Sequence, residues 1–164
     1  MDIDLTSMIK QSVIDLRYVN GLMVMNAASN INNMLTPQNF TMPLKIEMRA
    51  KTEIDNIRIG YHKGCFIFDV FCNYGGLDID DFVSGERRVY DGDGVVPPDE
   101  FVDIECIIGN DIVVIKVNGE LRHAGDNYEY IQKIKENPLP PAPIRITPSW
   151  NSTLTVEYLR VIEF

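Results

Sequence analysis

The chain has 164 residues, of which 45% are hydrophobic, and its 24 acidic and 15 basic residues give a formal net charge of −9. These values are typical of one globular domain with a real core, and they exclude a disordered chain, a collagen-like repeat and a coiled coil. The negative charge opposes binding to nucleic acid or to an anionic membrane surface, and no apolar stretch approaches the roughly 18 residues of a membrane span. We therefore expect a single domain over residues 1–164 with no nucleic-acid or membrane partner.

The beginning of the sequence and the cysteines predict a cytoplasmic location. The first ten residues lack the basic start and the long apolar run of a secretory signal. Cys65, Cys72 and Cys106 lie in strand-like segments without a CxxC spacing. We expect them to be buried free thiols, as in a reducing compartment.

The first 35 residues allow two interpretations. Apolar residues at helical spacing over residues 5–16 favour a helix, whereas residues 13–18 and 22–28 equally suit two edge strands. From about residue 41 the pattern is clearer, because apolar or small residues alternate with charged ones from Leu44 to Lys51. This alternation predicts a strand with one buried and one solvated face.

A tight turn at Lys63-Gly64 predicts a hairpin between residues 56–62 and 65–72. The expected register, listed as facing pairs, is Ile57 with Val70, Ile59 with Phe68, Tyr61 with Phe66, and Arg58 with Asp69. The same turn places His62 opposite Cys65. Without a third ligand or an orienting acid, we expect that pair to be a surface feature and not a zinc site or a nucleophile.

A second hairpin joins residues 101–108 to residues 112–117 through an even-length turn, which keeps the apolar residues of both strands on one face. Lys116 then faces Asp103 or Glu105. The dipeptide Asn118-Gly119 is typical of a type I′ turn and predicts one more strand.

The last third of the chain contains one short helix and two strands. Residues 127–136 have apolar residues at helical spacing, an Asn or Asp for a cap, and Pro138 as a stop, so they predict a surface helix. Residues 143–147 and 153–162 predict strands, and the slipped alternation at Tyr158-Leu159 predicts a bulge.

About ten strands with short turns and little helix predict an all-β fold, a two-layer antiparallel sandwich. The expected outer faces carry Ile67, Phe71, Val114 and Leu121. Apolar residues there indicate a concave surface that another segment covers or that presents a ligand groove.

Several segments together resemble the concanavalin A-like lectin/glucanase superfamily, which includes laminin G-like modules and bacterial sugar-associated jelly rolls. The similar segments are residues 40–52, 56–61, 94–105, 115–120 and 154–162. The resemblance covers about residues 20–164 and implies a jelly-roll sandwich. It favours carbohydrate binding by analogy of fold.

Laminarinase-type glycosidases of this superfamily carry Glu-x-Asp-x-Glu or Glu-x-Asp-x-x-Glu on one strand. The nearest match here is Glu100, Asp103 and Glu105, and Glu100 has the opposite strand parity to the other two. A pair of carboxylates about a glycosidic bond is therefore not expected, and no residue is assigned a catalytic role.

Acidic residues are concentrated between residues 76 and 105. Asp91, Asp93 and Glu100 match three positions of an EF-hand calcium loop, but Val89 stands at its first position and two prolines interrupt it. An EF-hand is excluded. A looser calcium site with Asp91 and Asp93 stays open beside a solvated glycine-rich loop.

A sugar site needs aromatic rings for stacking and planar polar groups for hydroxyls. The candidates in or beside loops are Tyr74, Asp78, Asp80, Tyr90, Arg122 and Trp150. The sequence thus predicts a non-catalytic jelly-roll module that binds a carbohydrate or another small ligand. Two alternatives stay open: a divergent glycoside hydrolase with acids from residues 76–81 and 91–105, and an interaction domain that binds a partner protein or a second copy.

Overall fold

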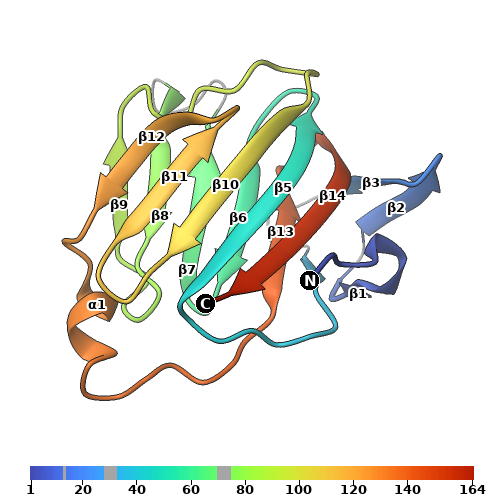
Figure 1. Cartoon of the computed structure of the whole chain (residues 1–164). Helices are drawn as coiled ribbons and strands as arrows, with labels where there is room; N and C mark the ends of the chain where they lie inside the picture. Colours follow the sequence, from blue (N-terminus) through green and yellow to red (C-terminus); the bar gives the residue numbers. More distant parts are fainter. Residues whose placement is uncertain (13, 28–32, 70–74) are drawn as a thin grey trace.

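The computed structural model describes residues 1–12, 14–27, 33–69 and 75–164, and these form two antiparallel sheets packed face to face (Figure 1). Sheet I has the strand order β1 (Ile9–Lys10), β4 (Met34–Leu35), β13 (Ile144–Pro148), β6 (Ile57–Tyr61), β7 (Gly64–Phe68), β8 (Leu77–Asp80), β9 (Arg87–Tyr90). Sheet II has the order β12 (Glu120–Gly125), β11 (Val113–Val117), β10 (Val102–Ile108), β5 (Leu44–Thr52), β14 (Thr153–Glu163), β3 (Leu22–Ala27), β2 (Ile14–Val19). The predicted two-layer all-β sandwich is confirmed.

The core lies between the sheets and follows the alternation of the strands. In β5 every second residue from Leu44 to Thr52 is buried, and the residues between them are partly exposed. Sheet I contributes Ile57, Ile59, Phe66 and Phe68 from the facing side. Both sheets thus bury one face against each other and leave the other face outward.

The hairpin of β6 and β7 exists, but its predicted register was wrong by two residues. Ile57 pairs with Phe68 and Ile59 with Phe66, so Arg58 lies opposite Ile67 and not opposite Asp69. The turn consists of His62, at φ 50°, and Lys63, and Gly64 is the first residue of β7.

Gly64 is needed for packing rather than for the turn. A Cβ at Gly64 would lie 2.1 Å from Cδ1 of Phe82, a ring that follows β8. The glycine therefore makes room for a residue almost twenty positions later in the chain. That contact is non-local, and a turn pattern does not reveal it.

The second hairpin has the expected register. Glu105 pairs with Lys116, whose Nζ lies 2.9 Å from Oε1 of the glutamate. Asn118 and Gly119 both have positive φ, as a type I′ turn requires. In β14 the register shifts between Val156 and Tyr158, which places the bulge beside the predicted position.

The two helical expectations had different outcomes. The first residues form strands β2 and β3 after a short 3-10 turn, η1 (Leu5–Ser7), so strands are confirmed over the helix. Of these two, only β2 is an edge strand, because β3 lies between β14 and β2. Helix α1 (Glu129–Lys133) lies within the predicted range, but its N-cap is Tyr128 without a side-chain cap. Asp81 accepts the hydrogen bond of the Tyr130 amide instead, at 3.2 Å. Within the described residues no helix is long and apolar enough to cross a membrane.

The predicted apolar surface does not form. Ile67 is on the outer side of sheet I, whereas Val114 and Leu121 are on the outer side of sheet II, so the two groups face opposite directions. Phe71 lies outside the described residues. The reason is the sheet order, because the two hairpins that carry these residues belong to different layers.

Candidate functional site

The outer side of sheet I carries two rows of side chains, which strand alternation and antiparallel register place across β13, β6, β7, β8 and β9. The first row consists of Arg145, Gly60, Cys65, Asp80 and Arg87. The second row consists of Thr147, Arg58, Ile67, Asp78 and Val89. We call these two rows the arginine face. On this face charged side chains lie beside two buried residues, Ile67 and Asp78.

Arg145 lies flat on the neighbouring strand. Its guanidinium group donates to the carbonyl oxygens of His62 and Gly64, the latter at 3.0 Å. This position is available because Gly60 has no side chain, and a Cβ there would lie 2.6 Å from Nη2 of Arg145. The two carbonyls fix the orientation of the guanidinium group but do not neutralise its charge.

Arg87 is matched by carboxylates. It binds Asp80 through two hydrogen bonds, Nε to Oδ1 at 2.8 Å and Nη2 to Oδ2 at 3.0 Å. Its Nη1 also lies 3.5 Å from Oδ2 of Asp78. A bidentate pair of this kind holds both planar groups in a fixed orientation.

Asp78 is a buried acid with spare hydrogen-bonding capacity. The residue is only 1% exposed, and its Oδ1 has no hydrogen-bond partner among the described residues. Burial raises the pKa of this carboxyl above its ordinary value, while the charge of Arg87 opposes the change. Most buried polar atoms in native proteins are paired, so an unpaired one calls for an explanation.

Arg58 lies across Ile67 from Asp78. Its Nε is buried without a hydrogen-bond partner, and no ion pair joins it to any described residue. Ile67, at 5% exposure, forms an apolar floor between the two strands. The arrangement offers a donor and an acceptor on either side of an apolar patch.

The pKa of the Cys65 thiol depends on the charges of the arginine face. Burial, together with the charge of Asp80, raises the pKa of its thiol to about 11, although Arg145, Arg58 and Arg87 act to lower it. All three guanidinium groups therefore act on this one sulfur. A thiol with so high a pKa is protonated and unreactive at neutral pH.

The predicted facing pair of His62 and Cys65 is wrong. Cys65 pairs with Gly60, and His62 is in the turn itself. Cys65 and Cys106 are free, Cys106 is fully buried and Cys65 only partly so, and Cys72 lies outside the described residues.

The sequence-predicted ligand residues do not form one site. Asp78 and Asp80 lie together on the arginine face, and Tyr74 lies outside the described residues. Trp150 is 62% exposed in the turn between β13 and β14. Arg58, Arg87 and Arg145 were not predicted as ligand residues, although the outward parity of Arg58 and Arg87 in their strands was a readable signal.

Tyr90 and Arg122 belong to a second cluster, where β9 and β12 approach each other. The hydroxyl of Tyr90 lies 3.1 Å from that of Tyr128, which in turn lies 2.8 Å from Nε2 of His123. Arg122 donates through Nη1 to the carbonyls of Asp93 and Val95 at 3.2 and 2.9 Å. These contacts join the two sheets at one edge.

The calcium prediction gains no support from the geometry. Asp91 and Asp93 lie in the loop after β9, and no group of three or more His, Cys, Asp or Glu side chains within the described ranges could hold a metal ion. Two carbonyls near this loop already accept hydrogen bonds from Arg122.

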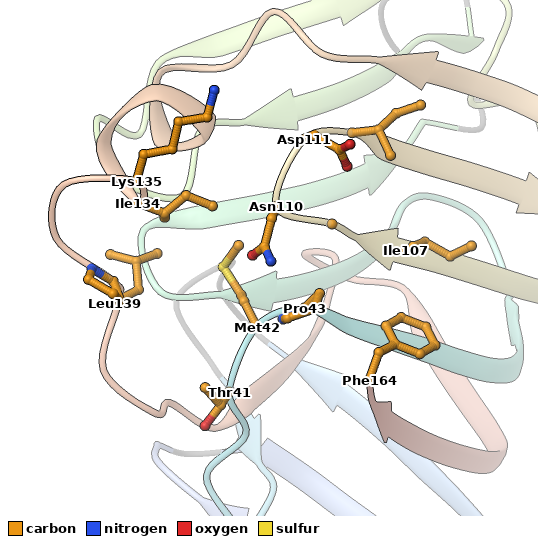
Figure 2. Close-up of a pocket in the computed structure, with 13 residues that line it drawn as sticks. Thr41, Met42, Pro43, Ile107, Asn110, Asp111, Ile134, Lys135, Leu139 and Phe164 are labelled. Atoms are coloured by element: carbon orange, nitrogen blue, oxygen red, sulfur yellow. The ribbon is translucent and has the colours of Figure 1, made fainter.

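A separate apolar groove of about 770 Å³ lies at one end of the sandwich (Figure 2). Its walls are the turn between β10 and β11, the segment before β5, and the connector after α1. Met42, Ile134, Leu139 and Phe164 supply apolar surface, and Asn110 lies beside Met42 and Pro43. This groove has few polar groups, in contrast to the arginine face.

No protein-family model matches the sequence, and no curated protein sequence matches it. Solved structures do. The carbohydrate-binding module CBM66 from Bacillus subtilis aligns with a TM-score of 0.68 at 8% identity, over 94% of each chain. A Bacillus licheniformis β-glucanase aligns with a TM-score of 0.67 at 10% identity, over 97% of this chain and 94% of the other.

The exoplasmic/lumenal domain of VIP36, in a form with Ca²⁺ and mannose bound, gives a TM-score of 0.66 at 9% identity, over 96% of this chain and 83% of the other. At such identities the similarity concerns the fold. The chain has the concanavalin A-like jelly-roll fold, as its sequence resemblance implied.

Proposed function

We propose that this protein binds a saccharide on the arginine face. The observation that carries the proposal is the pair of unsatisfied buried atoms, Oδ1 of Asp78 and Nε of Arg58, on either side of Ile67. Leaving a buried polar atom unpaired costs about 1–3 kcal/mol, which a ligand that pairs with both atoms would recover. Other buried side-chain atoms of the described residues also lack a hydrogen-bond partner, and these two are the ones that flank one apolar residue on an outer side of a sheet.

A sugar ring suits this arrangement. Its hydroxyl groups both donate and accept, so one can donate to the Asp78 carboxylate while another accepts from Arg58, and hydrogen bonds to charged groups are the stronger kind. The apolar side of the ring can pack on the small part of Ile67 that is exposed. That structural neighbours include a carbohydrate-binding module and a mannose-bound lectin supports the same class of ligand.

The proposal is binding without hydrolysis. Two of the acids considered for a divergent hydrolase, Asp103 and Glu105, lie on the outer side of sheet II, where they pair with Arg49 and Lys116. They are on the opposite side of the molecule from Asp78 and Asp80. On the arginine face, Asp80 is held by Arg87 through both of its oxygens.

The test is a panel of neutral and acidic mono- and oligosaccharides, screened by the thermal unfolding midpoint and then by calorimetry. A ligand that binds only the folded state adds about 2.7 kcal/mol of stability at a hundredfold excess over its dissociation constant. Asp78→Asn removes an acceptor oxygen and is expected to weaken binding about tenfold or more.

Asp103→Asn is the matched control, because it makes the same change on the outer side of the other sheet. It should bind as the unchanged protein does. No midpoint shift with any saccharide at millimolar concentration would overturn the proposal. So would a sugar whose affinity is the same in Asp78→Asn but falls in Ile112→Asn, because Ile112 lines the apolar groove.

A further inference from the structure

The three arginines of the arginine face differ in how their charges are balanced. Arg87 has Asp80 and Asp78 as partners. Neither Arg58 nor Arg145 forms an ion pair with any residue that the structure describes. The chain has 24 acidic and only 15 basic residues, so an arginine without an acidic partner is notable.

The two unbalanced arginines are neighbours. Thr147 pairs with Arg58 and Arg145 pairs with Gly60, so Arg58 and Arg145 are diagonal neighbours on adjacent strands and share the outer side. Both act on the sulfur of Cys65, which lies on β7, one strand from Arg58 and two strands from Arg145. Like charges side by side on a sheet repel one another unless an anion lies between them.

Arg58 and Arg145 also have N–H groups that donate to no described residue. Arg145 uses one N–H of Nη1 and one of Nη2 for two backbone carbonyls, which hold the planar group in place and leave its other N–H groups for a ligand. Arg58 has a buried Nε with no acceptor. The fixed guanidinium group of Arg145 and the neighbouring one of Arg58 match the planar, two-oxygen geometry of a carboxylate.

Resting on the saccharide-binding function proposed above, we infer that the sugar is acidic and that Arg58 and Arg145 bind its carboxylate. The carboxylate lies at the β13 and β6 end of the face, and the hydroxyl groups extend over Ile67 toward Asp78. A uronic acid residue has this combination of one anionic group and several hydroxyls.

The same face argues against a densely charged polyanion. Asp78 and Asp80 lie two strands away from Arg58 and would repel a second and third anionic group. The net charge of −9 adds to that repulsion over the rest of the surface. One carboxylate flanked by hydroxyls is therefore favoured over a phosphate backbone or a heavily sulfated chain.

The experiment compares oligomers of galacturonic acid with oligomers of galactose of the same length, and glucuronic with glucose oligomers, by calorimetry on the full chain. We expect at least one acidic oligomer to bind about tenfold or more tightly than its neutral counterpart. This preference should weaken with rising salt, because it depends on charge.

Arg58→Gln is expected to reduce the affinity for the acidic oligomer about tenfold and the affinity for the neutral oligomer less, because a hydroxyl contact is weaker than a contact with a carboxylate. Arg58→Lys keeps the charge but not the fork, and should recover part of the loss. Arg17→Gln is the control, since Arg17 is an exposed arginine on β2 in the other sheet. Unfolding midpoints of all variants show whether a loss of binding is a loss of fold.

The outcomes separate the two proposals. Equal affinities for acidic and neutral oligomers, with Asp78→Asn still weakening both, would overturn the acidic ligand and leave saccharide binding in place. An acidic preference that Arg58→Gln does not alter would also overturn it. Binding of none of these sugars, nor of any other in the panel, would overturn both.

Discussion

Nη2 of Arg145 lies where a side chain on Gly60 would have to be, 2.6 Å from the position of its missing Cβ. The two residues face each other on adjacent strands of sheet I. The glycine thereby determines where an arginine from a strand more than eighty residues later comes to lie.

Gly60→Ala should therefore move Arg145 without unfolding the protein. The clash is with the far end of a flexible side chain, and φ at this residue is not in the left-handed region, so we expect a loss of about 1 kcal/mol or less. Affinity for an acidic saccharide should fall several-fold. The pair of measurements is a urea unfolding curve and a calorimetric titration, and unchanged affinity would show that the position of Arg145 does not matter for binding.

Asp78→Asn should make the protein more stable at neutral pH while it weakens binding. Burial raises the pKa of this carboxyl, so its contribution to stability is present below the ordinary carboxyl range and is lost as the pH rises through the raised pKa. At pH 7 the ionised group costs stability, and the neutral amide removes that cost. We expect a gain on the order of 1 kcal/mol in the free energy of unfolding.

The matched variant Asp103→Asn should lose stability slightly or not at all, because Asp103 is half-exposed and pairs with Arg49 at the surface. A gain in that variant as large as in Asp78→Asn would mean that reduced net charge, and not burial, is the cause.

The two histidines should make the protein less stable in mild acid. Burial lowers the pKa of His62, and Arg145 lowers it further; burial also lowers the pKa of His123, although Asp93 opposes this. The unfolded chain then takes up protons at a higher pH than the folded one. Stability is present above the ordinary histidine pKa and is lost as the pH falls through that range.

Urea unfolding at pH 7.5, 6.5 and 5.5 measures this slope. His123→Gln should flatten it, because the imidazole that accepts or donates at the Tyr128 hydroxyl is gone. A slope that persists in the double variant His62→Gln, His123→Gln would assign it to other groups.

Gly94→Ala should be strongly destabilising. A Cβ there would lie 1.9 Å from the carbonyl oxygen of Gly76, a backbone atom that cannot move aside, and the Gly94 amide is bonded to Gly75. We expect a loss of about 3 kcal/mol or more. Gly119→Ala is the comparison, because nothing lies within 4 Å of its Cβ and only the positive φ of 77° is strained, so it should lose about 1 kcal/mol.

Local sequence patterns predicted the strands that have one solvent-exposed face. They did not predict features that depend on contacts between residues far apart in the sequence. The alternation from Leu44 to Lys51 sufficed for β5, because each charged residue there faces solvent. The register of β6 and β7 was missed because Gly64 accommodates Phe82, which no local pattern connects to it. The first strands could not be chosen over a helix, since short apolar segments suit both.

The candidate site was predicted only in part for the same reason. Asp78 and Asp80 were named from one stretch of sequence. Arg145 joins them only because β13 lies between β4 and β6, and that strand order is a property of the whole sheet. Arg145 follows Arg58 by eighty-seven positions in the sequence. It cannot be assigned to the same surface until the strand order is known.

Strand β5 is enclosed by β10 on one side and β14 on the other, and its residue Thr52 pairs with Leu154, about a hundred positions later. Until β14 arrives, β5 has an open edge of unpaired backbone groups, which can recruit another chain. Loop closure over such a separation is slow. Refolding of this protein should therefore be slow and sensitive to concentration, and dilution during refolding should raise the yield of native protein.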